Sequence, residues 1–219
     1  MSELTQALDG IGGLSKTSKM PWYSFGIPAT ECKVGSKLAQ IEGTVCHGCY
    51  ALKGFYRMHN VKNALYQRLF KLESAHRNGK IDEWIEAFVT ALKLKHKRAK
   101  GEDRFRWHDS GDLQGAWHLD AICEIARRTP FLRHYLPTKE YQLVSKYPKD
   151  NIPPNLYLRV SHPKVGYSFK DGTYAGFDTS TVGFEGDGVK QCPAYTQGGE
   201  CQACDSCWRS GFVVNYKEH

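Results

Sequence analysis

The chain has 219 residues, of which 41% are hydrophobic, 24% charged and 12% aromatic. These proportions exclude a disordered, collagen-like or membrane-spanning chain, and the length favours one globular domain. Thirty Lys and Arg residues against 23 Asp and Glu residues give a formal net charge of +7. This charge gives weak support to nucleic acid as a partner, because it is also ordinary for solubility and no long basic run concentrates it.

The first residues, MSELTQALDGIGG, are acidic and polar. A secretory signal begins with a basic region followed by an apolar one, so we expect a cytoplasmic protein with no membrane contact. The chain has eight cysteines. In a reducing compartment cysteines are more often metal ligands or catalytic groups than disulfides, and the composition therefore points to a metal-binding protein.

Three segments follow one another within the single domain that we expect over residues 1–219. Residues 1–50 carry Gly, Pro and Cys without periodicity and predict a loop-rich N-terminal segment. Residues 51–165 form the predicted α/β body, in which apolar stripes over 61–72 and 81–92 predict two helices. Residues 166–219 form a Cys-rich C-terminal segment, and its stretch 167–188 predicts loop or hairpin.

The middle of the body predicts strands that alternate with helices. RFRWHDSGDL reads as a strand from Arg104 and a turn, in which Asp112 is placed to cap the next helix. Strand-like runs over 132–136 and 156–160 follow, and PTKEY after the first of them opens a short helix. This alternation predicts a parallel sheet with helices on it, whose functional site lies in the loops after the strands.

The C-terminal cysteines have the most specific spacing in the chain. Cys192, Cys201, Cys204 and Cys207 form C-x8-C-x2-C-x2-C. Three thiolates in successive steps of this kind wrap an iron–sulfur cube well, whereas a zinc ribbon uses two separated pairs; zinc and purely structural thiols stay open as alternatives. The adjacent glycines at 198 and 199 would allow a tight turn that points amides at the cluster.

A second set of cysteines lies near the N-terminus. Cys32 precedes the pair Cys46 and Cys49, and three thiolates would leave a fourth iron position open to a ligand. The alternative is one cluster that uses Cys46 and Cys49 with two C-terminal cysteines. We expect His47, between the pair, to point away from a metal, and Cys123 to lie in the core on an apolar helix face.

Polar residues follow three of the predicted strands. His108, Asp109, Lys139 and His162 are the candidate catalytic residues, because the ends of parallel strands meet at one edge of a sheet. They would then line one opening with Cys46 and Cys49 at its rim. The alternative is that Asp109 only satisfies the amides of a turn.

The motifs PWYSFGIPATECKVGSK, TVCHGCYALKGFY, RFRWHDSGDLQ, YLPTKEY, LYLRVSHPKVGY and CPAYTQGGECQACDSCW together resemble the phage gene product 88 family. The CHGCYA, DSGD and TK elements are also similar to those of phage radical S-adenosylmethionine proteins, where a three-cysteine cluster lies at the mouth of a partial barrel. The resemblance implies an α/β fold with a partial (β/α) barrel-like parallel sheet and a place in the host cytoplasm. It also implies that Cys32, Cys46 and Cys49 fill the place of that cluster.

The sequence supports three functions. The first is an iron–sulfur protein with at least one [4Fe-4S] cluster, for electron transfer with a partner or for structure. The second is a radical S-adenosylmethionine-type enzyme, whose small-molecule ligand the sequence does not identify. The third is a zinc-stabilised nucleic-acid-binding module.

Overall fold

The computed structural model describes residues 1–99, 101–170 and 172–218, and it contains one open sheet of seven parallel strands in the order β1-β2-β3-β4-β5-β7-β6. The strands are β1 (Ser24–Phe25), β2 (Arg104–Trp107), β3 (Arg133–Thr138), β4 (Leu156–Ser161), β5 (Asp178–Val182), β6 (Val189–Gln191) and β7 (Val213–Tyr216). The α-helices are α1 (Glu3–Ile11), α2 (Lys33–Leu38), α3 (His59–Arg77), α4 (Ile81–His96), α5 (Ala116–Arg128) and α6 (Tyr141–Lys146). Six short 3-10 helices complete the elements: η1 (Ala29–Glu31), η2 (Tyr50–Leu52), η3 (Gly54–Arg57), η4 (Lys149–Asn151), η5 (Pro193–Thr196) and η6 (Ser206–Trp208). The predicted α/β class with a parallel, partial barrel-like sheet is confirmed.

The two faces of the sheet differ sharply in polarity. Side chains alternate along a strand, and residues paired between parallel strands point to the same side. Phe105, Trp107 and Leu136 are fully buried on one face, in the apolar core that the helices cover. Arg106 and Tyr135 are paired in register on the opposite face. Parallel sheets are normally apolar on both faces, so the polar second face requires a polar or charged cover.

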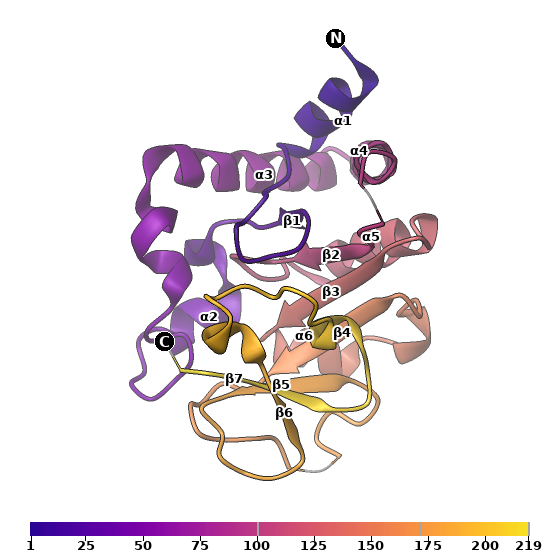
Figure 1. Ribbon diagram of the computed structural model, residues 1–219. Coiled ribbons are helices and arrows are strands. Elements are labelled where there is room, and N and C mark those ends of the chain that lie inside the picture. Colours follow the sequence, from indigo (N-terminus) through magenta and orange to yellow (C-terminus); the bar gives the residue numbers. More distant parts are fainter. Residues whose placement is uncertain (100, 171, 219) are drawn as a thin grey trace.

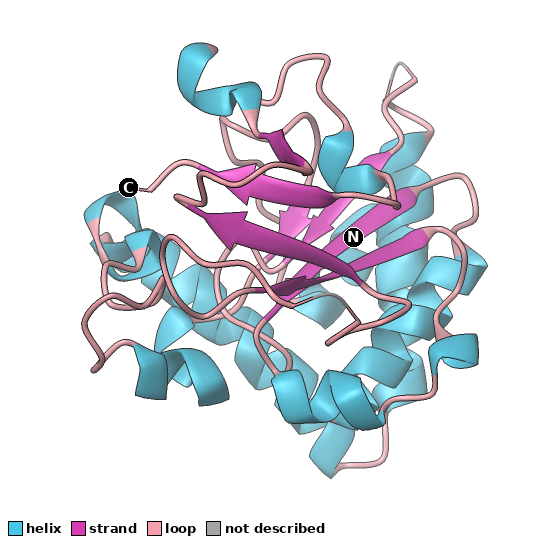
Figure 2. Cartoon of the chain, turned by 90° about the horizontal axis from the view of Figure 1, so that it is seen from below, coloured by secondary structure: helices cyan, strands magenta, loops and turns pink. Residues whose placement is uncertain are grey.

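The helices and the C-terminal segment cover opposite faces. Figure 2 shows most of the helices gathered on one side of the strands. Helix α4 packs against α1, α3 and α5 in this layer. The C-terminal segment, yellow in Figure 1, crosses in front of the strands on the polar face. In the described part of the chain, no helix is both long enough and apolar enough to cross a membrane.

Two segments contain more regular structure than their sequences predict. Residues 1–50 include α1, β1 and α2, and residues 167–188 include β5, which pairs in parallel with β4 and β7. The prediction of loop or hairpin over 167–188 is therefore wrong for Asp178–Val182. This strand escapes prediction because its sequence, DTSTV, is polar. The buried Thr181 hydroxyl is instead paired with the Asn215 side chain at 2.8 Å.

Candidate metal centres

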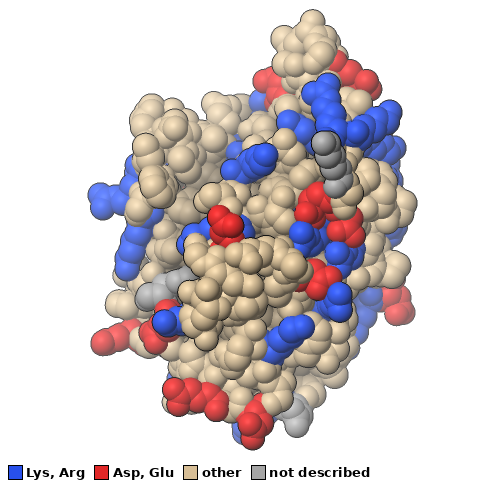
Figure 3. Space-filling view, in the orientation of Figure 1, with Lys and Arg blue, Asp and Glu red and all other residues tan. Residues whose placement is uncertain are grey.

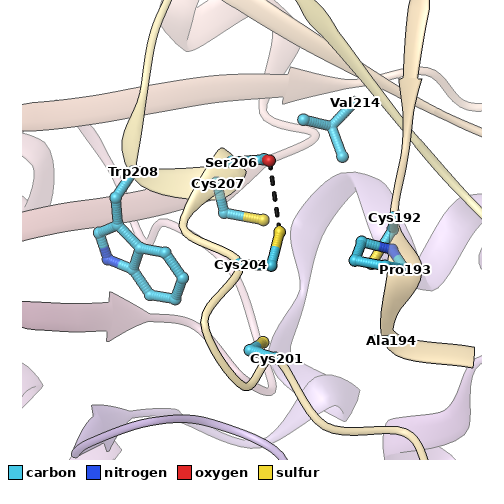
Figure 4. Close-up of a pocket in the computed structure, with 9 residues that line it drawn as sticks. All are labelled: Cys192, Pro193, Ala194, Cys201, Cys204, Ser206, Cys207, Trp208 and Val214. Carbon is cyan, nitrogen blue, oxygen red and sulfur yellow. Dashed lines mark hydrogen bonds between the residues drawn. The ribbon is translucent and has the colours of Figure 1, made fainter. Parts of the chain in front are cut away.

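The four C-terminal cysteines line one partly open pocket. Cys192 follows β6, Cys201 and Cys204 lie in the next loop, and Cys207 lies in η6. Figure 4 shows the sulfur atoms of Cys204 and Cys207 near each other on one wall, with Cys192 across the cavity and Cys201 at its far end. All four thiols are free. The structure thus brings together the four cysteines of the C-x8-C-x2-C-x2-C motif.

The loop that carries these cysteines turns through unusual backbone conformations. Gly198 and Gly199 have φ of 67° and 85°, in the left-handed region that glycine adopts without strain. Gln202 has φ of 44°, which is uncommon for a residue with a side chain. The Cys201 amide donates to the Lys19 carbonyl at 3.1 Å, which fixes the start of the loop. The tight turn expected from the two glycines is present.

Hydroxyl groups approach two of the sulfur atoms. The Ser206 hydroxyl lies 3.3 Å from Cys204 Sγ, and the Tyr216 hydroxyl lies 3.2 Å from Cys207 Sγ. The Trp208 ring closes one wall of the cavity and is only 1% exposed. Hydrogen bonds to ligating sulfurs and exclusion of water are two means by which proteins set the potential of an iron–sulfur cluster.

Arginines on the polar face of the sheet hold the cysteine loop in place. Arg104 donates to the carbonyls of Gln202 and Cys204, at 3.3 and 3.2 Å. Arg133 pairs with Asp205 at 3.0 Å. The outer surface over this segment carries mostly uncharged side chains in the centre of Figure 3. Arg104 and Arg133 are themselves ion-paired, with Glu102 at 2.7 Å and with Asp103 at 2.8 Å.

Burial and the positive charge of Arg106 act on the pKa of the thiols in opposite directions. Burial raises the pKa of Cys192 and Cys207 above the usual value and that of Cys201 to about 11. The Arg106 guanidinium lowers the pKa of all three thiols. A thiol must lose its proton to bind a metal, so a nearby cation favours the form that ligates.

The cysteines are not arranged around a single ion. No group of three or more His, Cys, Asp and Glu side chains in residues 1–99, 101–170 and 172–218 could hold one metal ion as placed. Four thiolates on one zinc lie within about 4 Å of one another, because each Zn–S bond is about 2.3 Å. A [4Fe-4S] cube places iron and sulfide between its ligands and holds them farther apart.

Cys32, Cys46 and Cys49 form a second group at the carboxyl edge of β2 and β3. A methyl group placed on Gly35 would lie 3.6 Å from Cys32 Sγ and 3.7 Å from Cys46 Sγ. The missing side chain thus leaves a small space between these two sulfurs. Burial raises the pKa of Cys32 and Cys46, and Cys49 raises both further through its charge.

Asp112 and Lys139 border this second group. Asp112 raises the pKa of both Cys32 and Cys46 through its charge, and Lys139 lowers both. The Glu140 carboxylate accepts from the Val34 amide at 3.0 Å. Two carboxylates and an ammonium group beside three thiols are able to orient a polar ligand.

The predicted role of Asp112 as a helix cap is wrong. Helix α5 begins after Gly115, which makes no side-chain cap. Asp112 instead accepts from the Thr138 hydroxyl at 2.7 Å and from the Lys139 amide at 2.8 Å. It therefore connects the ends of β2 and β3, because a buried carboxylate binds whichever donors the fold brings to it.

The other candidate catalytic residues occupy different environments near the same edge. His108 is 3% exposed, has φ of 51° and packs on the His118 ring at 5.4 Å. Both His108 ring nitrogens and Asp109 Oδ1 are buried without a hydrogen-bond partner. The Asp109 carbonyl accepts from the Tyr50 hydroxyl at 2.6 Å. The His162 ring packs against the Phe169 ring, with 4.6 Å between the ring centres.

His47 and Cys123 were expected to lie outside any metal site. His47 is exposed, with its ring 3.2 Å from the Ala39 carbonyl. Cys123 is fully buried on α5, where the Tyr147 hydroxyl lies 3.7 Å from its sulfur. Burial raises the pKa of Cys123 to about 11, as is normal for an inert core thiol.

Comparison with known proteins identifies the family of the chain. The family model of Gene product 88 matches residues 2–210. The chain belongs to the Gene product 88 family. This is a family of phage proteins, as the sequence motifs suggest. No curated protein and no solved structure matches the chain.

The structure adds functional candidates in this Gene product 88 protein that motif spacing does not reveal. Glu140 and Gly35 lie beside the N-terminal cysteines, and Arg106 lies beneath the C-terminal ones. Only Arg106 has a signal in the sequence. Arg104 and Arg106 alternate with aromatic residues in RFRW, and this pattern predicts one cationic face on the strand.

Proposed function

We propose that this phage protein binds iron–sulfur clusters and that Cys192, Cys201, Cys204 and Cys207 hold a [4Fe-4S] cluster. The observation that carries the proposal is that four free thiols line one pocket. The Arg106 guanidinium, which lowers the pKa of three of the four thiols, would offset part of the negative charge of a thiolate-bound cluster. The cluster would serve electron transfer or hold the C-terminal segment on the sheet.

Metal analysis of two matched cysteine variants tests this proposal. Protein purified without oxygen should be brown and contain iron with acid-labile sulfide. Cys204→Ser should lose about four iron atoms per chain, because it removes a ligand of one cube. It should also unfold more easily, since a cluster that binds only the folded state adds to its stability. Cys123→Ser is the control and should keep all its iron. Colourless wild-type protein with stoichiometric zinc would contradict the proposal.

The second candidate function is a radical S-adenosylmethionine-type enzyme built on Cys32, Cys46 and Cys49. The observation that favours it is the position of Asp112 and Lys139 beside the sulfurs. Three thiolates leave one iron of a cube without a cysteine ligand, and the carboxylates and the ammonium group would recognise a zwitterionic ligand there. Incubation with dithionite and S-adenosylmethionine should release 5′-deoxyadenosine. Cys46→Ser should abolish that release, and its persistence in this variant would exclude the assignment.

A further inference from the structure

Two tyrosines anchor the segment that joins the N-terminal cysteines to α3. The Tyr50 hydroxyl donates to the Asp109 carbonyl at 2.6 Å, and the Tyr56 hydroxyl donates to Asp109 Oδ2 at 3.2 Å. The two tyrosine rings meet edge to face, with 5.7 Å between their centres. These contacts hold η2 and η3 against the carboxyl end of β2, and the residues between and after the tyrosines are left facing solvent.

Large apolar side chains of this segment are uncovered. Phe55 in η3 is 81% exposed, and Met58, Tyr66 and Phe70 are exposed as well. The last three are spaced four residues apart, so they lie in one row along α3, and η3 contacts the same helix. Single exposed apolar residues are ordinary, whereas a group of large ones marks a binding surface.

The same segment carries positive charge without acidic residues. Residues 43–72 contain no Asp or Glu. Lys53, Arg57 and Lys62 are exposed, and Lys62 lies in the apolar row of α3. Within the described residues none of these three cations forms an ion pair, whereas the arginines at the end of α5 are paired with carboxylates. At the left edge of Figure 3, where the purple segment before α3 lies in Figure 1, Lys and Arg side chains stand among uncharged ones.

These side chains define one surface, which we call the α3 surface. It comprises Lys53, Phe55, Arg57, Met58, Lys62 and Phe70. The Tyr66 hydroxyl lies 3.0 Å from the Thr30 hydroxyl, and the following residue, Glu31, is exposed and bounds the surface on that side. The mixture of rings and lysines argues against a partner protein, because lysine is depleted where proteins bury surface against each other.

We propose that the α3 surface binds single-stranded nucleic acid, with Phe55 and Phe70 stacking on bases and the three cations contacting phosphates. Cations without carboxylate partners are free to neutralise phosphates, and bases without a partner strand expose faces that stack on aromatic rings. Contacts of both kinds tolerate any sequence. The inference goes beyond the proposed function, because it requires no metal.

Fluorescence anisotropy with labelled oligothymidylate and oligouridylate measures the binding, and the two probes distinguish DNA from RNA. Wild-type protein should bind a single strand more tightly than a duplex of the same length, because paired bases stack on each other. Phe55→Ala should weaken binding about tenfold, which is within the range for the loss of one stacked base. Phe55→Leu should weaken it as much, since leucine is apolar but has no ring, and Phe55→Trp should keep it. Tyr195→Ala removes an exposed ring on η5, outside the surface, and should bind as the wild-type protein does.

The salt dependence of binding tests the cations separately. The double variant Lys53→Gln and Arg57→Gln should reduce the slope of log affinity against log salt concentration by about 1.4, because each phosphate contact on a single strand contributes about 0.7. The matched control is Lys97→Gln with Arg98→Gln, which removes the same charge from exposed positions after α4 and should keep the wild-type slope. Equal reductions in the two double variants would show that net charge alone attracts the strand, and they would overturn the proposal.

Three other results would also overturn it. The first is wild-type protein that binds neither probe at low salt. The second is Phe55→Leu protein that binds as tightly as wild type, because stacking would then play no part. The third is a different occupant of the surface, shown by tighter binding to phosphatidylserine vesicles or by a dimer in analytical ultracentrifugation that Phe55→Ala dissociates. None of these results bears on iron content, so the proposed function would stand. Colourless zinc protein that binds the strand through Phe55 would instead contradict the proposed function and support this inference.

Discussion

At the scale of single residues, Gly35 sets the space between two sulfurs. A Cβ at this position would lie 2.9 Å from Cys32 Cβ, closer than real Cβ atoms approach, and near both Cys32 Sγ and Cys46 Sγ. We therefore predict that Gly35→Ala loses the iron of the N-terminal group and keeps that of the C-terminal group. Iron analysis of protein purified without oxygen measures this loss.

Gly48 offers a control from the same motif. A Cβ there would meet nothing within 4 Å, although Gly48 lies between Cys46 and Cys49. Gly48→Ala should keep the full iron content. Equal iron in both alanine variants would show that the space beside Gly35 is not used by a metal group.

At the scale of elements, Asp112 joins the carboxyl ends of β2 and β3. Its carboxylate accepts from the Thr138 hydroxyl and from the amides of Leu113 and Lys139. Asp112→Asn replaces one acceptor oxygen with a donor that faces these donors. We expect the free energy of unfolding to fall by about 1–3 kcal/mol, the typical cost of an unsatisfied buried polar group. Urea denaturation measures it, with the exposed Asp150→Asn as a control that should change little.

The elements also show what the sequence predicts well and what it does not. Helices α3 and α4 and strands β2, β3 and β4 are predicted because apolar residues recur at the period of each element. The partner of Asp112 is not predictable, because the donors on β3 become its neighbours only after the strands pair. The same reason hides Gly35 and Glu140, whose roles depend on a long-range approach to the cysteines. The two cysteine groups are predictable from the sequence, because most cysteines in each group lie only a few residues apart along the chain.

At the scale of the whole molecule, buried neutral histidines link stability to pH. Burial lowers the pKa of His108 and His134 to about 3, from an ordinary value of 6.5. The Trp107 indole donates to His134 Nδ1 at 3.2 Å, so the neutral ring presents Nε2–H to the Thr129 hydroxyl at 2.9 Å. Between pH 6.5 and 3 the unfolded chain binds these protons and the folded chain does not. The stabilisation is therefore complete above pH 6.5 and is lost as the pH falls toward 3.

His134→Gln removes one of these titrations and keeps a polar side chain at the position. Each such histidine contributes a slope of about 1.4 kcal/mol per pH unit within the window. Between pH 4 and 6 the free energy of unfolding should therefore fall less steeply in the variant than in the wild-type protein, by about that slope. Any loss of iron in acid affects both proteins equally, so the difference between their slopes reports on His134. His59→Gln, at an exposed position on α3, should keep the wild-type slope. Parallel slopes for His134→Gln and the wild-type protein would mean that His134 titrates normally in the fold.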